Sequence, residues 1–426
     1  MPAGDSVISI ITPFGPSHEP FILQAYHSLT EQDHENWEWI LVPNNGAAVP
    51  GVLGADSRVK VHEFAEPGIN IGKLKRFACE RVAGDVIVEF DADDILLLGA
   101  LAGVSKAFED SAVQFVYSND AYFREGTWAP TSFNEFWGWR HRDFEHAGHK
   151  LTVNVNFPLT AHSLRQVFFS PDHLRAWRTK AYWETGGHDA TLSIGDDHDL
   201  MCRFYIKYGA RGFKGIDEVL YLYRKHDKNS CTVHNASIQK QTEKNYCKYR
   251  TALSEKWAEE NGLPMLDFGG RFHKFPRYLS VDIEPPADVV CDLNQTFPWE
   301  DNSIGVIRAS HVAEHLVDPI HFMNECHRVL APGGWLLMEV PSADGRGAFQ
   351  DPTHKSFWNE NSFWYYTTAQ YASFIRPQYK GRFQASRVVT YYPNAFFKEH
   401  EIPCVQADLI CLKPPYDDHP PGGARI

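Results

Sequence analysis

The sequence predicts an α/β protein with two Rossmann-like domains, each built on a mostly parallel sheet. The prediction comes from the length, from the alternation of β-rich and helix-like segments in the first half, and from a second domain that begins near residue 263, after a polar helix. A chain of 426 residues is too long for one ordinary core. We therefore expect a first domain at 1–235, a helical linker at 236–262 and a second domain at 263–426.

Composition narrows the class of protein. A hydrophobic content of 43% with 22% charged residues is typical of a globular protein. The sequence contains no run of about 18 apolar residues, the length that would predict a membrane span. The first residues, MPAGDSVISI, lack a signal-peptide pattern, so we expect a cytoplasmic location. The eight cysteines form no CxxC pair, which favours reduced core thiols. The net charge of −13 argues against broad affinity for nucleic acid or anionic membranes, although it leaves a local basic groove open.

The first half alternates strands with helices. We expect strands at 6–14, 37–46 and 86–90, and helices at 20–32 and 71–84. Because parallel strands present their carboxyl ends at one edge of a sheet, three loops should meet there. These loops are 12–14, 44–46 and 91–94.

Three carboxylates, Asp91, Asp93 and Asp94, directly follow the strand VIVEF, and a helix is expected to start within 96–101. Their repulsion is costly unless they are hydrogen-bonded, solvated or neutralised by a cation. The alternative interpretation is an acidic turn in which Asp93 or Asp94 caps the helix.

The segments ISIITPF, EWILVPNNG and GKLKRFACERVAGDVIVEFDADD resemble, in this order, the GT-A nucleotide-diphospho-sugar glycosyltransferases, in particular family 2, over about residues 6–228. The resemblance implies that Asp91-Ala92-Asp93 is the DxD motif, with Asp93 on a Mn²⁺ or Mg²⁺ ion. The donor-binding residues would be Thr12, Pro13, Asn44, Asn45, Gly72, Lys75, Arg76 and Asp91. Asn44-Asn45 replaces an acidic pair of many family members and Lys75-Arg76 replaces Arg-Asn, so the nucleotide is left open.

The segment ETGGHDATLSIGDDHDL at 184–200 resembles the part of this family that carries the general base. The resemblance implies Asp197 as the base, with Asp196 in place of the usual Glu. A base is needed because a sugar hydroxyl is a poor nucleophile until its proton is being removed. The alternative is that Asp196, Asp197 and Asp199 cap a helix and complement its dipole. His226, in LYLYRKHDKNS, is a candidate third metal ligand or diphosphate contact, or else an ordinary surface histidine.

A basic, aromatic-rich stretch lies between these motifs. From 137 to 180 there are seven Lys/Arg against three Asp/Glu, a local charge of +4. Candidate acceptor residues are Trp137, Trp139, Arg140 and Arg142, with Arg175 and Arg178 as further cations. Aromatic rings and cations suit a sugar, a flipped base or single-stranded nucleic acid, and the alternative is plain aromatic packing.

Residues 263–341 resemble class I S-adenosylmethionine-dependent methyltransferases, and the domain is expected to extend to about residue 400. The resemblance implies cofactor contacts at Gly269, Asp282 and Asp292. The glycine loop contains Gly269 and Gly270, but Arg271 stands where a third glycine is expected. In addition, 15 positions separate Asp267 from Asp282, whereas dinucleotide folds have about 20. S-adenosylmethionine binding is left open, and a scaffolding or acceptor-positioning domain is preferred.

The pentapeptide HVAEH at 311–315 fits a zinc-protease pattern. It also falls at a helix start typical of methyltransferases, so zinc is not expected there. His354 lies in an aromatic segment that could line the second pocket.

Together these features predict a metal-dependent, inverting glycosyltransferase that uses a nucleotide-diphosphate sugar. The fusion of the two domains resembles bacteriophage and bacterial modification enzymes. This resemblance suggests a 5-hydroxymethylpyrimidine in DNA, a glycan or a virion protein as the acceptor. If the gene is phage-encoded, we expect the protein to act in the host cytoplasm. A bifunctional glycosyltransferase/methyltransferase and a non-catalytic sugar-nucleotide-binding module are the alternatives.

Overall fold

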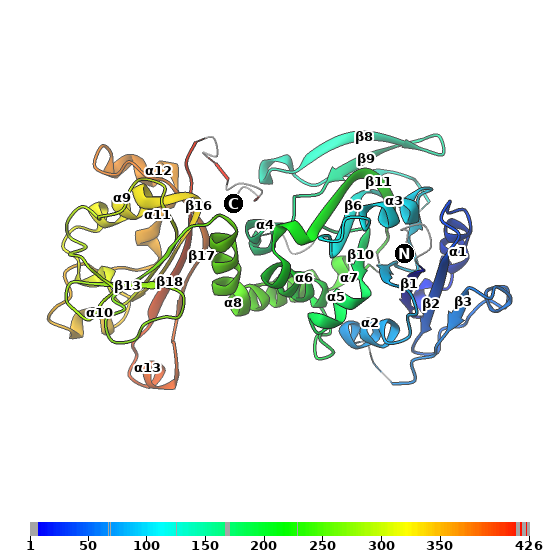
Figure 1. Ribbon diagram of the computed structural model, residues 1–426, viewed down its shortest axis with the longest axis horizontal. Coiled ribbons are helices and arrows are strands. Elements are labelled where there is room, and N and C mark those ends of the chain that lie inside the picture. The colour runs from blue at the N-terminus through cyan, green and yellow to red at the C-terminus, as the bar shows by residue number, and fades with distance from the viewer. Residues whose placement is uncertain are drawn as a thin grey trace. The chain divides into compact units, whose positions relative to one another are not determined.

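In the computed structural model the described residues are 7–66, 68, 70–124, 126–166, 171–227, 229–414, 418–419 and 423. The chain divides into two compact units, 1–250 and 251–426, and each contains its own sheet (Figure 1). Helix α8 (Asn235–Glu260) occupies the segment expected as a helical linker, and the division between the units falls within it.

The sheet of the first unit follows the order β3-β2-β1-β4-β10-β6-β11-β5. Strands β1, β2, β3 and β4 pair in parallel, and β10 inserts antiparallel between β4 and β6. Their bounds are β1 Ile8–Phe14, β2 Trp37–Pro43, β3 Val59–Val61, β4 Val86–Glu89, β5 Ile95–Leu96, β6 Phe115–Arg124, β10 Arg175–Arg178 and β11 Phe213–Lys225. The predicted parallel arrangement is therefore confirmed for the N-terminal half of this unit.

Helices connect these strands, and α1 and α2 illustrate how they form. Helix α1 packs Ile22, Ala25 and Leu29 into the core, as its helical spacing predicts. Helix α2 begins after Asn70, whose side chain accepts a hydrogen bond from Lys73 N at 2.9 Å. The helices are α1 Ile22–Thr30, α2 Ile71–Cys79, α3 Ala100–Ala107, α4 Ala161–Gln166, α5 Thr179–Glu184, α6 Asp196–Tyr208 and α7 Ser230–Val233.

The basic, aromatic-rich stretch forms a hairpin of β8 (Arg140–His146) and β9 (His149–Val155), and β9 pairs with β6 (Figure 1). A short strand, β7 (Pro130–Thr131), pairs with Tyr122 and Phe123 of β6, directly after the two β6 residues that pair with β9.

The helix expected to start within 96–101 begins later, at Ala100. Ile95 and Leu96 instead form strand β5, which pairs with Leu222 and Tyr221 of β11. Gly99 has a positive φ of 87°, which turns the chain from this strand into α3. The prediction was wrong because pairing with β11, more than 120 residues away, overrides the local helical pattern.

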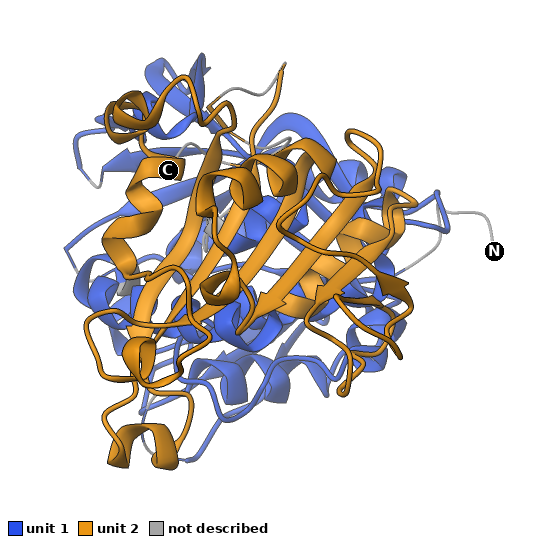
Figure 2. Ribbon diagram, turned by 90° about the vertical axis from the view of Figure 1, so that its left-hand side faces the viewer, with its two compact units in different colours: residues 1–250 blue, residues 251–426 orange. Residues whose placement is uncertain are grey.

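The second unit has the strand order β14-β13-β12-β15-β16-β18-β17, and Figure 2 shows these strands side by side. Strand β18 pairs antiparallel with both β16 and β17, while the other neighbours pair in parallel. This is the doubly wound order with one antiparallel strand inserted. The bounds are β12 Met265–Phe268, β13 Leu279–Asp282, β14 Val289–Val290, β15 Ile304–Ser310, β16 Leu330–Pro341, β17 Phe383–Tyr391, β18 Cys404–Cys411, α9 Pro319–Val329, α10 Gly347–Gln350, α11 Trp364–Thr367, α12 Ala369–Ala372 and α13 Ala395–Glu399.

Within the described ranges, no helix is both long enough and apolar enough to cross a bilayer.

Candidate functional site

The carboxyl ends of β1, β2 and β4 meet, as the sequence predicts. Asn44 N donates to the carbonyl oxygen of Phe14 at 3.0 Å, and Phe90 N donates to that of Ile11 at 3.1 Å. The hydroxyl of Thr12 donates to the carbonyl oxygen of Phe90 at 2.7 Å. The three loops therefore begin at one edge of the sheet.

Asp93 and His226 lie in direct contact at this edge. The His226 Nε2 atom is 2.8 Å from Asp93 Oδ2, and the His226 ring stacks on Phe21 with centroids 5.7 Å apart. Burial alone would raise the pKa of Asp93, but the hydrogen bond with His226, together with weaker contributions that include the nearby His18, lowers the pKa overall. The two residues assigned to the metal from sequence are therefore brought together.

The neighbouring Asp94 has a different role. It is buried and accepts hydrogen bonds from the Tyr221 hydroxyl at 2.8 Å and from Arg224 N at 2.7 Å. Burial and the nearby charges of Asp93 and Asp91 raise its pKa well above the ordinary value. Since α3 starts only at Ala100, after Gly99, the helix-cap alternative for Asp93 or Asp94 was wrong.

Asp91 is the most accessible carboxylate of the three, with 45% of its side chain exposed. Its Oδ2 lies 3.8 Å from Nε2 of His173, and ligand atoms of Asp91, Asp94 and His173 all lie within 4.8 Å of one another. His173 is buried and stacks on Tyr221 with ring centroids 4.5 Å apart. Sequence reasoning missed His173, because it lies within the stretch interpreted as the acceptor region.

A buried network of charges lies behind this edge. Glu89, the last residue of β4, is within ion-pair distance of Lys75 Nζ at 3.1 Å, Arg175 Nε at 3.2 Å and His188 Nε2 at 3.0 Å. Trp177 Nε1 also donates to Glu89, at 3.1 Å. Burial alone would raise the pKa of Glu89, but the surrounding cations lower it well below the ordinary value.

Asp197 is held by the same network. Arg175 Nη1 donates to Asp197 Oδ2 at 2.5 Å, and the backbone N of His198 donates to Oδ1 at 2.8 Å. Burial opposes ionisation, yet Arg175 and then Lys75 lower the pKa of Asp197 to about 2. This low pKa keeps the carboxylate ionised at neutral pH. The side chain is 27% exposed, so it is open to solvent on one side.

Asp196 faces inward. Its Oδ2 is 3.0 Å from His188 Nδ1 and 3.6 Å from Lys75 Nζ, with 4% of the side chain exposed. The N-cap residue of α6 is Gly195, which forms no side-chain cap. Asp196 and Asp197 therefore serve the charge network and do not occupy the helix-cap position.

Several predicted donor-binding residues have structural contacts. The Thr12 hydroxyl is fully buried and also accepts a hydrogen bond from Trp39 Nε1 at 2.8 Å. A Cβ atom on Gly72 would lie 2.2 Å from the carbonyl oxygen of Asp189, so glycine lets α2 pack against that loop. Lys75 is buried in the charge network.

The remaining donor-binding candidates differ in their exposure. The Asn44 amide is buried and donates to Phe14 O at 2.9 Å, while Asn45 Nδ2 donates to Asn44 Oδ1 at 2.8 Å. Pro13 is half-buried in β1. Arg76 Nη1 donates to the carbonyl oxygen of Gly186 at 2.6 Å.

A hollow of about 480 Å³ lies beside Arg76. Phe64 and Phe77 line it with ring centroids 5.1 Å apart and edge-to-face, and Glu66 and Lys73 lie at its rim. This combination of aromatic faces and charged side chains at the end of β2 can hold a planar polar group.

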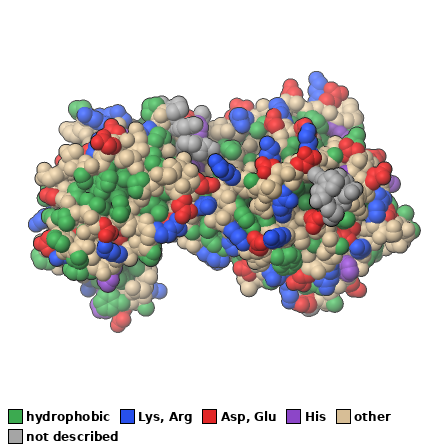
Figure 3. All heavy atoms as spheres, in the orientation of Figure 1, with side chains coloured by type: hydrophobic (Ala, Val, Ile, Leu, Met, Phe, Trp, Pro, Cys, Tyr) green, Lys and Arg blue, Asp and Glu red, His purple; other side chains and the backbone are tan. Residues whose placement is uncertain are grey.

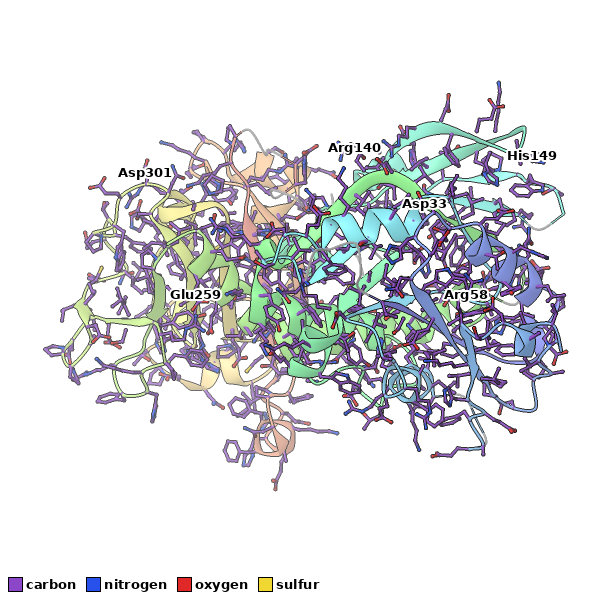
Figure 4. All side chains as sticks on the ribbon, turned by 45° about the vertical axis from the view of Figure 1, so that its right-hand side comes forward. Asp33, Arg58, Arg140, His149, Glu259 and Asp301 are labelled. Carbon is purple, nitrogen blue, oxygen red and sulfur yellow. The ribbon has the colours of Figure 1, made fainter. Side chains whose placement is uncertain are left out.

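The predicted acceptor residues divide into two groups. Trp137 is 44% exposed, and Arg140 is exposed at the start of β8, where Figure 4 labels it. Trp139 is only 7% exposed and packs between Phe133 and Phe157, so it cannot stack on an acceptor.

Of the four candidate arginines, Arg140, Arg142, Arg175 and Arg178, the last three are already engaged. Arg142 pairs with Asp217 at 3.3 Å, Arg175 is buried in the charge network, and Arg178 Nε donates to Val113 O at 2.7 Å. On the face shown in Figure 3, basic and acidic side chains are interspersed. Arg142, Arg175 and Arg178 therefore do not contribute to a free basic surface, while Arg140 and Lys150 are exposed.

In the second unit, the glycine loop is packed by the chain's own side chains. A Cβ atom on Gly269 would lie 2.5 Å from Val312 Cγ2. Arg308 Nη1 pairs with Asp267 at 2.6 Å, and the guanidinium lies over the ring of Phe275. Residues 269–278, all of them described, contain no helix, so a loop alone connects β12 to β13.

The two other cofactor candidates are near the surface. Asp282 ends β13, and its Oδ1 accepts a hydrogen bond from Glu284 N at 3.4 Å. Asp292 accepts from the backbone N of Asn294 at 2.9 Å and from its side chain at 3.0 Å. The described residues therefore do not form an evident cradle for S-adenosylmethionine.

Comparison with known proteins finds a family for part of each unit. Residues 9–172 match the family model for glycosyl transferase family 2, and residues 267–338 match the model for a methyltransferase domain.

Two curated relatives match parts of the chain. A probable S-adenosylmethionine-dependent methyltransferase of Mycolicibacterium smegmatis is 26% identical over 176 residues, 38% of this chain and 63% of the relative. An uncharacterized 37.1 kDa protein in transposon TN4556 of Streptomyces fradiae is 40% identical over 60 residues, 14% of this chain and 17% of the relative. The chain thus covers less than two thirds of either relative.

Among solved structures, S. aureus TarS 1–349 in complex with UDP-GlcNAc is 12% identical, covers 60% of this chain and 72% of that chain, and has a TM-score of 0.42. The mannosyltransferase PcManGT from Pyrobaculum calidifontis, in complex with GDP-Man and Mn²⁺, is 15% identical, covers 60% and 65%, and has a TM-score of 0.36. By its family models, the chain carries a family 2 glycosyl transferase domain at residues 9–172 and a methyltransferase domain at residues 267–338.

Proposed function

We propose that the first unit transfers a sugar from a nucleotide-diphosphate donor to an acceptor hydroxyl, with inversion at the sugar carbon. The observation that carries the proposal is the position of Arg175. It contacts Asp197, the candidate base, and Glu89, which lies two residues before Asp91 of the DxD motif. A single guanidinium thus connects the two halves of the predicted site.

Asp93 and His226 are the residues that would hold a divalent cation. A carboxylate and an imidazole suit Mn²⁺, and Asp93 is ionised at neutral pH because its pKa is lowered. When bound, such a cation neutralises charge on the diphosphate leaving group. Asp91, the more exposed carboxylate, is placed to hydrogen-bond the ribose or the sugar.

Asp197 would accept the proton of the acceptor hydroxyl. Its contact with Arg175 keeps it ionised and fixes its direction, and its exposed side leaves room for the acceptor. Ion pairing also makes it a weak base, so we expect the proton to move late, as the bond to the sugar carbon forms.

The hollow beside Arg76 is the proposed subsite for the nucleobase. Phe64 and Phe77 offer aromatic faces, and the Asn45 amide at the end of β2 offers a polar contact on the donor side. These groups favour no particular base, so the nucleotide stays open.

For the acceptor, the contacts favour a glycan or another uncharged hydroxyl compound over a 5-hydroxymethylpyrimidine in DNA. Trp137 is exposed and available for stacking. Among the candidate arginines, however, Arg142, Arg175 and Arg178 are held by contacts within the protein, which leaves Arg140 to contact a phosphate. Transfer to a neutral acceptor should barely respond to salt, whereas transfer to DNA should weaken steeply as ionic strength rises.

The test is hydrolysis and transfer with a panel of nucleotide sugars in the presence of Mn²⁺. Wild-type protein should release a nucleoside diphosphate from at least one donor, and Asp93→Asn and His226→Ala should not. His34→Ala, a change at a half-buried histidine of the same unit, is the matched control and should behave as wild type. Equal release by wild type and Asp93→Asn would refute the cation assignment.

A further inference from the structure

Two segments of the second unit are joined by backbone contacts. The carbonyl oxygen of Glu314 accepts hydrogen bonds from Lys355 N at 2.7 Å and from Ser356 N at 3.0 Å. The Ser356 hydroxyl donates to the carbonyl oxygen of Ala313 at 2.8 Å. These contacts hold the turn after β15 against the segment that follows α10.

This junction brings three metal-ligand side chains together. Ligand atoms of Glu314, His315 and His354 all lie within 4.8 Å of one another, and the two imidazole rings are 4.9 Å apart. Tetrahedral coordination at the usual bond lengths places ligand atoms about 3.4 Å apart, so a pair must close by at most about 1.4 Å. His315 is exposed and can supply that movement.

Glu314 is buried with one of its two carboxylate oxygens uncompensated. The residue is only 3% exposed, and its Oε2 has no hydrogen-bond partner among the described residues. Its other oxygen lies 3.5 Å from His311 Nδ1. Because an uncompensated buried carboxylate oxygen is costly, a ligand for Oε2 is expected.

Both histidines are oriented as metal ligands. His354 Nδ1 lies 2.8 Å from the carbonyl oxygen of Ala348, which can only accept, so Nδ1 carries the proton and Nε2 has the lone pair. The hydroxyl of Thr353 donates its one proton to Asp351 Oδ1 at 2.7 Å, so it accepts from His315 Nδ1 at 3.0 Å. Such partners on the other ring nitrogen are typical of metal-binding histidines.

We propose that Glu314, His315 and His354 form a Zn²⁺ site in the second unit, with a fourth position open to a water or an anionic ligand oxygen. Two histidines and a glutamate are a ligand set that zinc uses at sites with an open position. The site differs from the HVAEH pattern, because His311 lies between Glu314 and Glu339 and His354 supplies the third ligand. It is independent of the glycosyltransferase proposal.

The experiment measures zinc bound by the full chain after chelator treatment, reloading with Zn²⁺ and desalting, by mass spectrometry of the metal. Glu314→Gln, His315→Ala and His354→Ala should each retain one equivalent less than wild type. His400→Ala, at the C-cap of α13 in the same unit, should match wild type. Since His315 is exposed, its replacement leaves the core intact and keeps the test valid if another variant misfolds.

Co²⁺ provides a second readout, because four-coordinate Co²⁺ absorbs visible light much more strongly than the hydrated ion. Wild type and His400→Ala should show these bands, and the three ligand variants should lack them. Equal zinc content in wild type and all three ligand variants would overturn the proposal, as would an equal loss in His400→Ala.

Discussion

Replacing Asp197 by Asn separates its proposed catalytic role from its structural one. The pKa of Asp197 falls from 3.8 to about 2 in the folded chain, which corresponds to about 2 kcal/mol of favourable interaction for the ionised form. Because the pKa is depressed, this stabilisation is present above pH 3.8 and is lost as the pH falls toward 2. At neutral pH, Asp197→Asn should therefore cost at most about 2 kcal/mol, or about 4–8 °C in Tm for a unit of this size.

The effect on chemistry should be much larger. Loss of a general base lowers turnover by about two to four orders of magnitude, whereas donor affinity should survive because Asp197 faces the acceptor. The assay combines release of nucleoside diphosphate, titration of the donor in the presence of Mn²⁺, and thermal unfolding of the same preparation.

Asp199→Asn, on the same helix, is the matched control. Asp199 accepts hydrogen bonds from Arg203 Nε at 2.9 Å and from the Tyr249 hydroxyl at 2.7 Å, and it is buried. Its replacement should lower Tm but leave turnover per folded molecule unchanged. Unchanged turnover in Asp197→Asn, or a collapse of its donor affinity, would show that Asp197 is structural or metal-bound.

Three further predictions follow from other sites. Asp93→Asn should abolish Mn²⁺-dependent donor binding, measured by calorimetry, and leave the circular dichroism spectrum unchanged; retained binding would contradict the metal assignment. S-adenosylmethionine should show no micromolar affinity in calorimetric titration, because Arg308 forms an ion pair with Asp267 and no helix lies between β12 and β13. Micromolar binding would instead support the bifunctional alternative. Burial lowers the pKa of His327 to about 4, so the second unit should lose about 3 kcal/mol of stability as the pH falls from 6.5 to 4. Denaturant titrations should show this loss in wild type and a smaller one in His327→Gln, and equal losses would refute the assignment.

Local patterns in the sequence were sufficient to predict the edge of the sheet at which the site lies. The alternation of strands and helices places the ends of β1, β2 and β4 together, and the motif resemblance pairs Asp93 with His226 across 133 positions. Both predictions depend on a periodic pattern or on a short motif, which a single sequence contains.

The buried charge network could not be predicted in this way. Glu89 reads as a polar interruption of a strand, and Arg175 reads as one cation in a basic stretch. They meet because β10 pairs antiparallel with β4, which places Arg175 opposite Glu89. Trp139 was likewise assigned to the acceptor, although the hairpin buries it between Phe133 and Phe157. Long-range pairing of this kind leaves no trace in local periodicity.

The most direct test of the central claim is donor binding by wild type and Asp93→Asn, with and without Mn²⁺, across a panel of nucleotide sugars. The account predicts that at least one donor binds to wild type only when Mn²⁺ is present, and that Asp93→Asn binds none in either condition. If no donor binds to wild type with Mn²⁺, or if one binds equally to both proteins without it, the proposed cation-dependent glycosyl transfer is contradicted.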